Sequence, residues 1–207
     1  MMEKTFYIID DHEMLRVGTA SFITQNSNWI SLGGAKSIDS ALMDLENLRQ
    51  KDSLPAVIIC DLNFYGDNSG FNYIEKIRSL YPDVKIIVYS MFYAAGMVQG
   101  ALQSGACGYV SKNASSKEIL MCMEKALVGE VFIEEDLQIN LIKYNKLTDA
   151  LTKREKEVME LLLRRLSNDQ ISEKLGIKKR AVDNYVSLIY EKTGVNDRTS
   201  LIEKYGQ

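Results

Sequence analysis

The sequence predicts a doubly wound α/β domain with a five-stranded parallel sheet, followed by a small all-α domain of four helices. Three observations carry this prediction. Apolar runs alternate with amphipathic segments over residues 1–129, residues 148–207 show only helical periodicity, and the net charge changes sign between the two parts. With 207 residues, the chain is long enough for two small domains.

The strands of the first domain are short apolar runs rich in β-branched residues. Runs of this kind, with almost no polar interruption, are typical of strands buried on both faces of a parallel sheet. Three are strong, at residues 6–9, 56–60 and 85–89, and two are weaker, at 30–33 and 108–110. Amphipathic segments at 40–49, 72–80 and 115–127 predict helices that alternate with the strands. We therefore expect five strands and five helices within residues 1–129.

The second domain is predicted to contain only helices, over residues 154–166, 168–175, 179–193 and 198–205. Thr152 and Glu155 have the spacing of a capping box, and Gly176 and Gly194 stand where helices end. Residues 130–147 show no clear periodicity, and we assign them to a linker. The predicted division is thus 1–129, 130–147 and 148–207.

The composition excludes several classes of protein. Apolar residues make up 46% of the chain and charged residues 26%, with only two prolines, which excludes a disordered or fibrous chain. No apolar run is long enough to span a bilayer, and the first residues do not form a signal-peptide core, so we expect a cytoplasmic protein with no membrane partner. Three cysteines without paired spacing and a single histidine argue against a disulfide framework or a zinc site.

The two parts of the chain carry opposite charge. Residues 1–145 hold 12 Lys and Arg against 18 Asp and Glu, whereas residues 146–207 hold 13 against 10. An acidic first domain and a basic second domain indicate two different tasks.

Polar residues follow the predicted strands of the first domain. Asp10 and Asp11 follow the first strand, Asp61 the third, Ser90 ends the fourth and Lys112 follows the fifth. Because the carboxyl ends of parallel strands meet in one crevice, we expect these side chains to converge. Three converging carboxylates repel one another, and Mg²⁺ is the ion that such oxygen ligands prefer. The pattern predicts a carboxylate nucleophile for phosphoryl transfer.

These residues, in the strings IIDDH, ICDLN, VYS and GACGYVSK, resemble the receiver domain of two-component response regulators, over about residues 4–128. The resemblance implies a flavodoxin-like fold and a partner sensor histidine kinase. It also implies a role for each residue: Asp61 as phosphoacceptor, Asp10, Asp11, Asp61 and the main-chain carbonyl of Asn63 as ligands to Mg²⁺, Ser90 and Tyr109 as switch hydroxyl and switch aromatic, and Lys112 as the partner of a phosphoryl oxygen.

The sequence departs from the receiver pattern at two places. The loop that begins at Asn63 lacks a proline and is one residue longer than usual, and the residue after Ser90 is Met91 where a small residue is usual. We hypothesise that Met91 partly covers the phosphoryl group and slows its attack by water.

A helix, a short turn containing Gly176 and a second helix make up residues 168–193. In such a helix-turn-helix the second helix enters the major groove of DNA. The region 148–205 resembles the LuxR/NarL-type output domain, which implies double-stranded DNA as a partner. Val182, Val186 and Ile189 share one face of the second helix and are expected in the core. The candidate DNA-contacting residues are Lys178, Lys179, Arg180, Asp183, Asn184, Ser187, Lys192 and Arg198.

Two features keep an alternative open. Asp183 and Ser187 occupy positions that are often basic in this family, and phosphates repel Asp183 unless its carboxylate accepts a hydrogen bond from a cytosine amino group. The excess charge of the second part is only +3, so we expect modest, salt-dependent affinity and a homodimer when the chain is phosphorylated. The last helix, with Leu201, Ile202 and Tyr205, either supplies the dimer contact or closes the small core.

We consider three functions. The first is a transcription factor that phosphorylation switches to DNA binding. The second is a phosphorylation-responsive regulator that acts by protein contact, with weak or no specific DNA binding. The third is a phosphohydrolase like those of the haloacid dehalogenase superfamily, but that chemistry needs a second acid where this chain has Asn63. We expect the first, without enzymatic turnover of a free substrate.

Overall fold

The computed structural model describes residues 3–62, 70–91 and 94–205. The chain divides into two compact units, one of residues 1–92 and 100–134 and the other of residues 93–99 and 135–207. No helix among the described residues is long and apolar enough to cross a membrane.

The first unit contains a parallel sheet of six strands in the order β2-β1-β3-β4-β5-β6. The strands are β1 (Thr5–Ile9), β2 (Ile30–Ala35), β3 (Val57–Cys60), β4 (Lys85–Ser90), β5 (Gly108–Ser111) and β6 (Phe132–Ile133). The strand order reverses between β1 and β3, so their carboxyl ends flank the crevice where open α/β sheets bind ligands.

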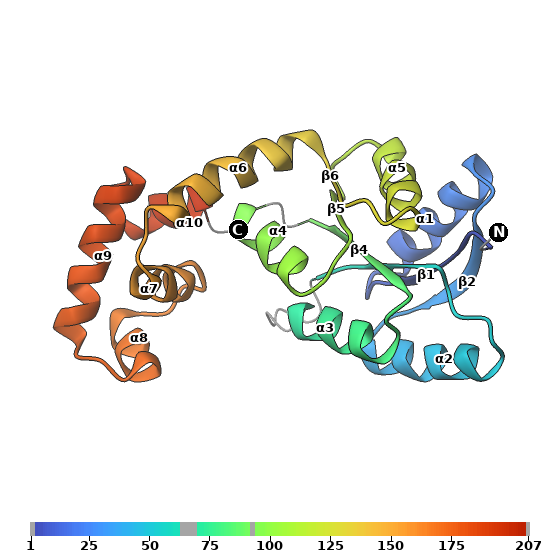
Figure 1. Ribbon diagram of the computed structural model, residues 1–207, viewed down its shortest axis with the longest axis horizontal. Helices are drawn as coiled ribbons and strands as arrows, with labels where there is room; N and C mark the ends of the chain where they lie inside the picture. The colour runs from blue at the N-terminus through green and yellow to red at the C-terminus, as the bar shows by residue number, and fades with distance from the viewer. Residues whose placement is uncertain (1–2, 63–69, 92–93, 206–207) are drawn as a thin grey trace. The chain divides into compact units, whose positions relative to one another are not determined.

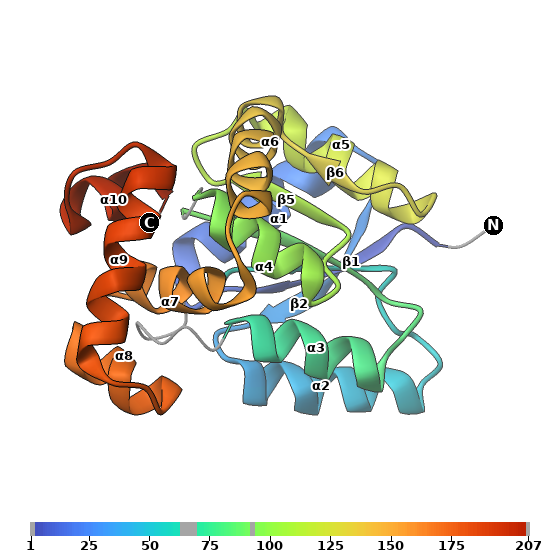
Figure 2. The same cartoon turned by 60° about the vertical axis from the view of Figure 1, so that its left-hand side comes forward.

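Helices cover both faces of the sheet. They are α1 (Glu13–Asn26), α2 (Ile38–Gln50), α3 (Gly70–Leu80) and α5 (Ser116–Leu127). Helix α4 (Ala95–Gln103) begins in the second unit and ends in the first. Helices α1 and α5 lie together on one face, and α2 and α3 lie on the other (Figures 1 and 2). Ile23 of α1 and Met123 of α5 join the same buried cluster as Phe6 and Ile59 of the sheet. The predicted doubly wound fold is confirmed.

The sheet has one strand more than predicted. The additional strand, β6, pairs with β5 through Phe132 and Ile133, and it is followed by helix α6 (Glu135–Asp149). The segment assigned to the linker, 130–147, therefore contains a strand and most of a helix. A two-residue strand has too few positions to show a period. In α6 the buried residues are Leu137 and Leu141, one turn apart, and two apolar positions are too few to indicate a helix from the sequence.

The second unit also contains α7 (Lys153–Leu163), α8 (Asn168–Leu175), α9 (Lys179–Thr193) and α10 (Arg198–Tyr205). The capping box of Thr152 and Glu155 opens α7, and Gly176 and Gly194 end α8 and α9 with φ of +62° and +64°. These caps explain why the predicted bounds of α8 and α9 agree with the structure.

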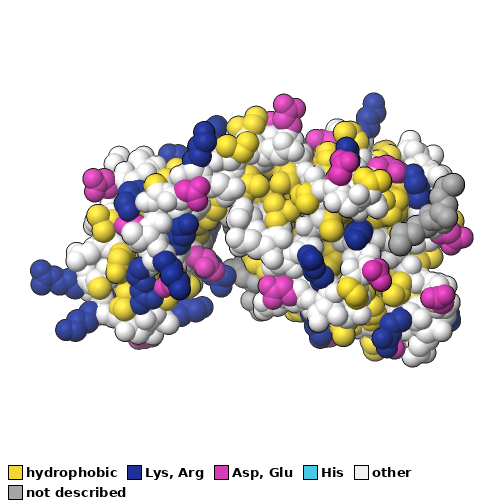
Figure 3. Space-filling view, in the orientation of Figure 1, with side chains coloured by type: hydrophobic (Ala, Val, Ile, Leu, Met, Phe, Trp, Pro, Cys, Tyr) yellow, Lys and Arg dark blue, Asp and Glu magenta, His cyan; other side chains and the backbone are white. Residues whose placement is uncertain are grey.

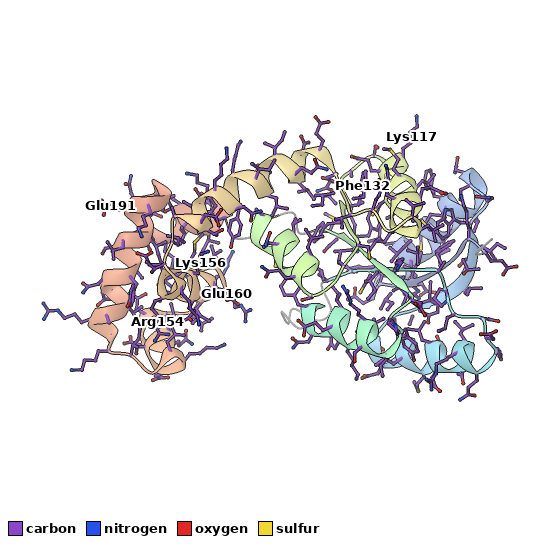
Figure 4. The ribbon with its side chains drawn as sticks, viewed as in Figure 1. Lys117, Phe132, Arg154, Lys156, Glu160 and Glu191 are labelled. Carbon is purple, nitrogen blue, oxygen red and sulfur yellow. The ribbon has the colours of Figure 1, made fainter. Side chains whose placement is uncertain are left out.

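Apolar residues from α6, α7, α8, α9 and α10 form a small core. Val182, Val186 and Ile189 of α9 are buried there, as predicted, and Leu201 of α10 is completely buried. The last helix thus helps to close this core. Arg154 of α7 (Figure 4) donates to the main-chain oxygen of Leu175 at 2.9 Å and so joins α7 to the end of α8.

Candidate functional site

The carboxyl ends of β1, β3 and β5 bring together Asp10, Asp61 and Lys112. The Lys112 ammonium lies 2.7 Å from Oδ2 of Asp10 and 2.6 Å from Oδ2 of Asp61. All three side chains are at most 5% exposed. The other oxygen of Asp61, Oδ1, accepts the main-chain N–H of Leu62 at 2.7 Å. Asp10, Asp61 and Lys112 thus converge, as expected from their places at the strand ends, and the lysine lies between the two buried carboxylates.

The electrostatics of Lys112 result from opposed effects. Burial favours the neutral amine, but the hydrogen bonds and negative charges of Asp10 and Asp61 outweigh it and raise the pKa of Lys112 above its usual value. The lysine is therefore charged at neutral pH and holds two carboxylates that would otherwise repel each other.

Asp11 and His12 complete an acidic cluster. One ligand atom from each of Asp10, Asp11, His12 and Asp61 lies within 4.8 Å of the others. Oδ1 of Asp11 is buried and accepts no hydrogen bond from the described residues, although it lies 2.8 Å from Nδ1 of His12. The His12 side chain is 60% exposed, whereas those of Asp10 and Asp61 are at most 5% exposed, so the carboxylates are the better ligands.

This donor set fits a hard divalent cation. Three carboxylates against one ammonium leave a net negative charge, and Oδ1 of Asp11 is buried without a hydrogen bond from the part of the chain that the structure describes. Oxygen donors with excess negative charge are what Mg²⁺ prefers. The fourth predicted ligand, the carbonyl of Asn63, lies outside the described residues.

Ser90 and Tyr109 lie on the neighbouring strands β4 and β5, and both are completely buried. Burial raises the pKa of Tyr109, and the charge of Asp61 adds to the effect, while a side-chain hydrogen bond with Ser90 opposes it. The predicted switch hydroxyl and switch aromatic are therefore in contact with each other and within the electrostatic reach of Asp61.

Glu134 lies beside the site but was not predicted from the sequence as a site residue. It follows β6, is 9% exposed, and its Oε2 accepts the main-chain N–H of Ser111 at 2.8 Å. Its own N–H donates to the main-chain oxygen of Tyr109 at 3.4 Å, so Glu134 holds β5 on both sides of Val110. Only recognition of β6 as a sixth strand would have placed Glu134 beside the switch residues.

The predicted outward face of α9 is exposed. Lys179, Arg180, Asp183, Asn184 and Ser187 all lie at the surface. Lys and Arg side chains gather over the part of the second unit formed by α7, α8 and α9 (Figure 3). The geometry is that of a helix-turn-helix with an exposed second helix.

The basic candidates fall into two groups. Lys178 and Arg180 are exposed and have no ion pair among the described residues, whereas Lys179 lies 2.8 Å from a carboxylate oxygen of Asp169. The negative charge of Asp169 raises the pKa of Lys179, chiefly through their hydrogen bond. Lys178 and Arg180 are thus the cations most available to DNA phosphates.

Lys192 and Arg198 have structural partners. The Lys192 ammonium lies 2.7 and 2.9 Å from the carboxylate oxygens of the buried Glu155, and Arg198 donates to the carbonyl of Leu166 and to Oδ1 of Asn168. Their role as phosphate contacts stays a prediction, and the structure favours a role in holding the helices of the second unit together.

The chain matches two family models. The model described as "Response regulator receiver domain" matches residues 6–124, and that of "Bacterial regulatory proteins, luxR family" matches residues 149–205.

Curated relatives match over nearly their full length. The transcriptional activator protein ExaE of Pseudomonas putida is 29% identical over 203 residues, covering 94% of this chain and 92% of the relative. The response regulator protein VraR of Staphylococcus aureus is 29% identical over 198 residues, with the same coverage of 94% and 92%.

Solved structures share the fold. The RcsB response regulator of Salmonella typhimurium matches with a TM-score of 0.65 and 22% identity, and the RcsB–DNA complex with a TM-score of 0.71 and 22% identity; in both, the match covers 98% of each chain. The receiver model alone spans more than half of the sequence. The chain therefore belongs to the response regulators, with a receiver domain followed by a DNA-binding domain of the luxR family.

Proposed function

We propose that this chain is a transcription factor whose DNA binding is switched by phosphorylation of Asp61 by a partner sensor histidine kinase. The observation that carries the proposal is the Lys112 ammonium held between Asp10 and Asp61 at the carboxyl ends of the strands. The same chain carries a helix-turn-helix with an exposed second helix.

Phosphorylation of Asp61 transfers a phosphoryl group without net hydrolysis. A carboxylate oxygen of Asp61 forms a bond to phosphorus while the bond from phosphorus to the donor's histidine nitrogen breaks. The donor ring carries a proton on its other nitrogen, so it leaves as neutral imidazole. Lys112, already 2.6 Å from Asp61, is placed to pair with an oxygen of the transferred group. Mg²⁺, held by Asp10, Asp11, Asp61 and the carbonyl of Asn63, would supply positive charge to the phosphoryl oxygens.

The phosphoryl group on Asp61 changes the hydrogen bonding of the switch residues Ser90 and Tyr109. Ser90 can donate its hydroxyl to a phosphoryl oxygen, which removes it from its hydrogen bond with Tyr109. The ring of Tyr109 is fully buried against this site, so a change in its partner alters packing on β5.

We infer that the output is binding to double-stranded DNA by a phosphorylated homodimer. Two second domains on adjacent half-sites multiply a modest single-site affinity. The DNA-bound RcsB structure, which has the same fold, supports the DNA-binding part of this inference. We place the activity in the cytoplasm and expect no turnover of a free substrate.

The test is selection of bound sequences from a random duplex pool at moderate salt. The chain is phosphorylated with a small-molecule acyl phosphate and Mg²⁺, and the Asp61→Asn variant is treated identically. We expect a motif of paired half-sites from the phosphorylated wild type only. The same motif from both proteins would remove phosphorylation as the switch, and no motif from either would favour a regulator that acts by protein contact.

A further inference from the structure

Three polar side chains of the second unit form a chain that ends on the exposed face of α9. Arg198 of α10 donates to Oδ1 of Asn168, the first residue of α8, and Asn168 donates from Nδ2 to Oδ1 of Asp183 at 2.7 Å. The residues lie 15 and 30 positions apart in the sequence, so the fold alone brings them together.

The direction of these hydrogen bonds is fixed by chemistry. A guanidinium has only donors, so the amide oxygen of Asn168 must face Arg198 and its NH₂ group must face Asp183. Arg198 is itself held, because its other terminal nitrogen donates to the carbonyl of Leu166. The Asn168 amide therefore has one orientation, and it fixes the Asp183 carboxylate through Oδ1.

The second oxygen of Asp183 has no hydrogen bond among the described residues, and the side chain is exposed. Asp183 lies on the fifth position of α9, in the part of a recognition helix that meets base edges. Lys178 and Arg180 stand close by in the sequence and carry the positive charge that offsets phosphate repulsion.

A fixed carboxylate oxygen discriminates among the four bases in the major groove. Cytosine presents an amino donor there, guanine and thymine present acceptors that repel a carboxylate, and adenine places the N7 acceptor beside its amino group. An acceptor held in one orientation thus favours cytosine.

We propose that Asp183 recognises a cytosine amino group at one position of each half-site, and that Asn168, held by Arg198, is the positioning residue that makes this recognition selective. The inference rests on the proposed function, because it requires specific DNA binding.

The experiment is the same duplex selection with the phosphorylated full-length chain and three variants. We expect a cytosine at one position of the wild-type half-site, preferred about tenfold over the other bases. Asp183→Asn should shift that position from cytosine to adenine, because an amide can pair with both N6 and N7 of adenine. Asn168→Ala should reduce the cytosine preference at that position several-fold and leave the other positions unchanged.

Asp169→Ala is the matched control. Asp169 is the neighbour of Asn168 and also contacts α9, through Lys179, but it makes no hydrogen bond to Asp183. Its removal should change the affinity for all sequences alike and leave the preferred bases the same. A purely structural role of Asn168 would give this uniform pattern too, so base preference separates the two roles.

The outcomes separate this inference from the proposed function on which it rests. A wild-type motif with no cytosine position sensitive to Asp183→Asn would overturn this inference and leave the proposed function intact. A uniform loss in Asn168→Ala would overturn the positioning role. Recovery of no motif by the wild type would contradict the proposed function and the inference together.

Discussion

Replacing Lys112 by methionine tests whether the lysine holds the acidic cluster together. The side chain is 3% exposed and contacts Asp10 and Asp61 at 2.7 and 2.6 Å. Methionine keeps most of the apolar length and removes only the charge and the hydrogen bonds. The variant leaves two buried carboxylates beside Asp11 without a cation.

The magnitude follows from the geometry. At an effective dielectric constant of about 20, each contact at this distance is worth about 6 kcal/mol of Coulomb energy, while dehydrating the ions costs several kcal/mol each. The net loss on removing one partner of a buried ion pair is about 3–5 kcal/mol. With a urea m value of about 2 kcal/mol/M, the unfolding midpoint should fall by about 2 M.

The assay is urea unfolding of the full chain followed by tryptophan fluorescence. Trp29 is the only tryptophan and is 2% exposed in the first unit, so its signal reports that unit. Lys117→Met, at an exposed lysine of α5 (Figure 4), is the control and should change stability by less than about 0.5 kcal/mol. Added Mg²⁺ should stabilise Lys112→Met more than the wild type, because a bound cation replaces the missing charge. A loss below 1 kcal/mol, or an equal response to Mg²⁺, would refute the reasoning.

Three further predictions concern other parts of the chain. The hydrogen bond from Lys192, with the cap hydrogen bond from Thr152, lowers the pKa of Glu155. Glu155→Gln should therefore destabilise the second unit by about 1–2 kcal/mol at pH 7, and the difference should shrink as the pH falls below the ordinary glutamate pKa of about 4.3 and vanish only below the lowered pKa of folded Glu155. Protection from amide exchange in α7 and α9, measured at pH 7 and in acid, checks this. If Met91, which is 51% exposed, shields the acyl phosphate, Met91→Ala should shorten its half-life several-fold in a phosphate-release assay, and an unchanged half-life would contradict the hypothesis. In Gly108→Ala the new methyl group would lie 2.3 Å from Sγ of Cys122, so the fluorescence assay should show that the free energy of unfolding falls by about 1–3 kcal/mol. Adding Cys122→Ala should restore part of this loss, and simple additivity of the two substitutions would exclude the clash.

The sequence predicted the elements that carry strong local signals. The predicted bounds of α8, α9 and α10 agree with the structure, and for α8 and α9 glycines at their ends supplied the signal. The convergence of Asp10, Asp61 and Lys112 also followed from sequence, because parallel strands deliver their carboxyl ends to one edge.

Features that depend on tertiary contacts could not be predicted. Strand β6 exists because its two residues pair with β5, and nothing in so short a segment indicates a strand. The same holds for Glu134, whose carboxylate accepts a main-chain N–H from a residue 23 positions away. Arg198 was predicted as a phosphate contact from its charge alone, whereas its contact with Asn168 joins residues 30 positions apart and arises only in the folded second unit.

The central claim is that the phosphorylation state of Asp61 sets the affinity for DNA. The most direct measurement is fluorescence anisotropy of a labelled duplex with two selected half-sites, titrated at fixed salt with phosphorylated and unphosphorylated chain. We predict that phosphorylation tightens binding at least tenfold in the wild type and that Asp61→Asn, treated with the same donor, shows no change. Equal affinities for the two forms of the wild type would contradict the account.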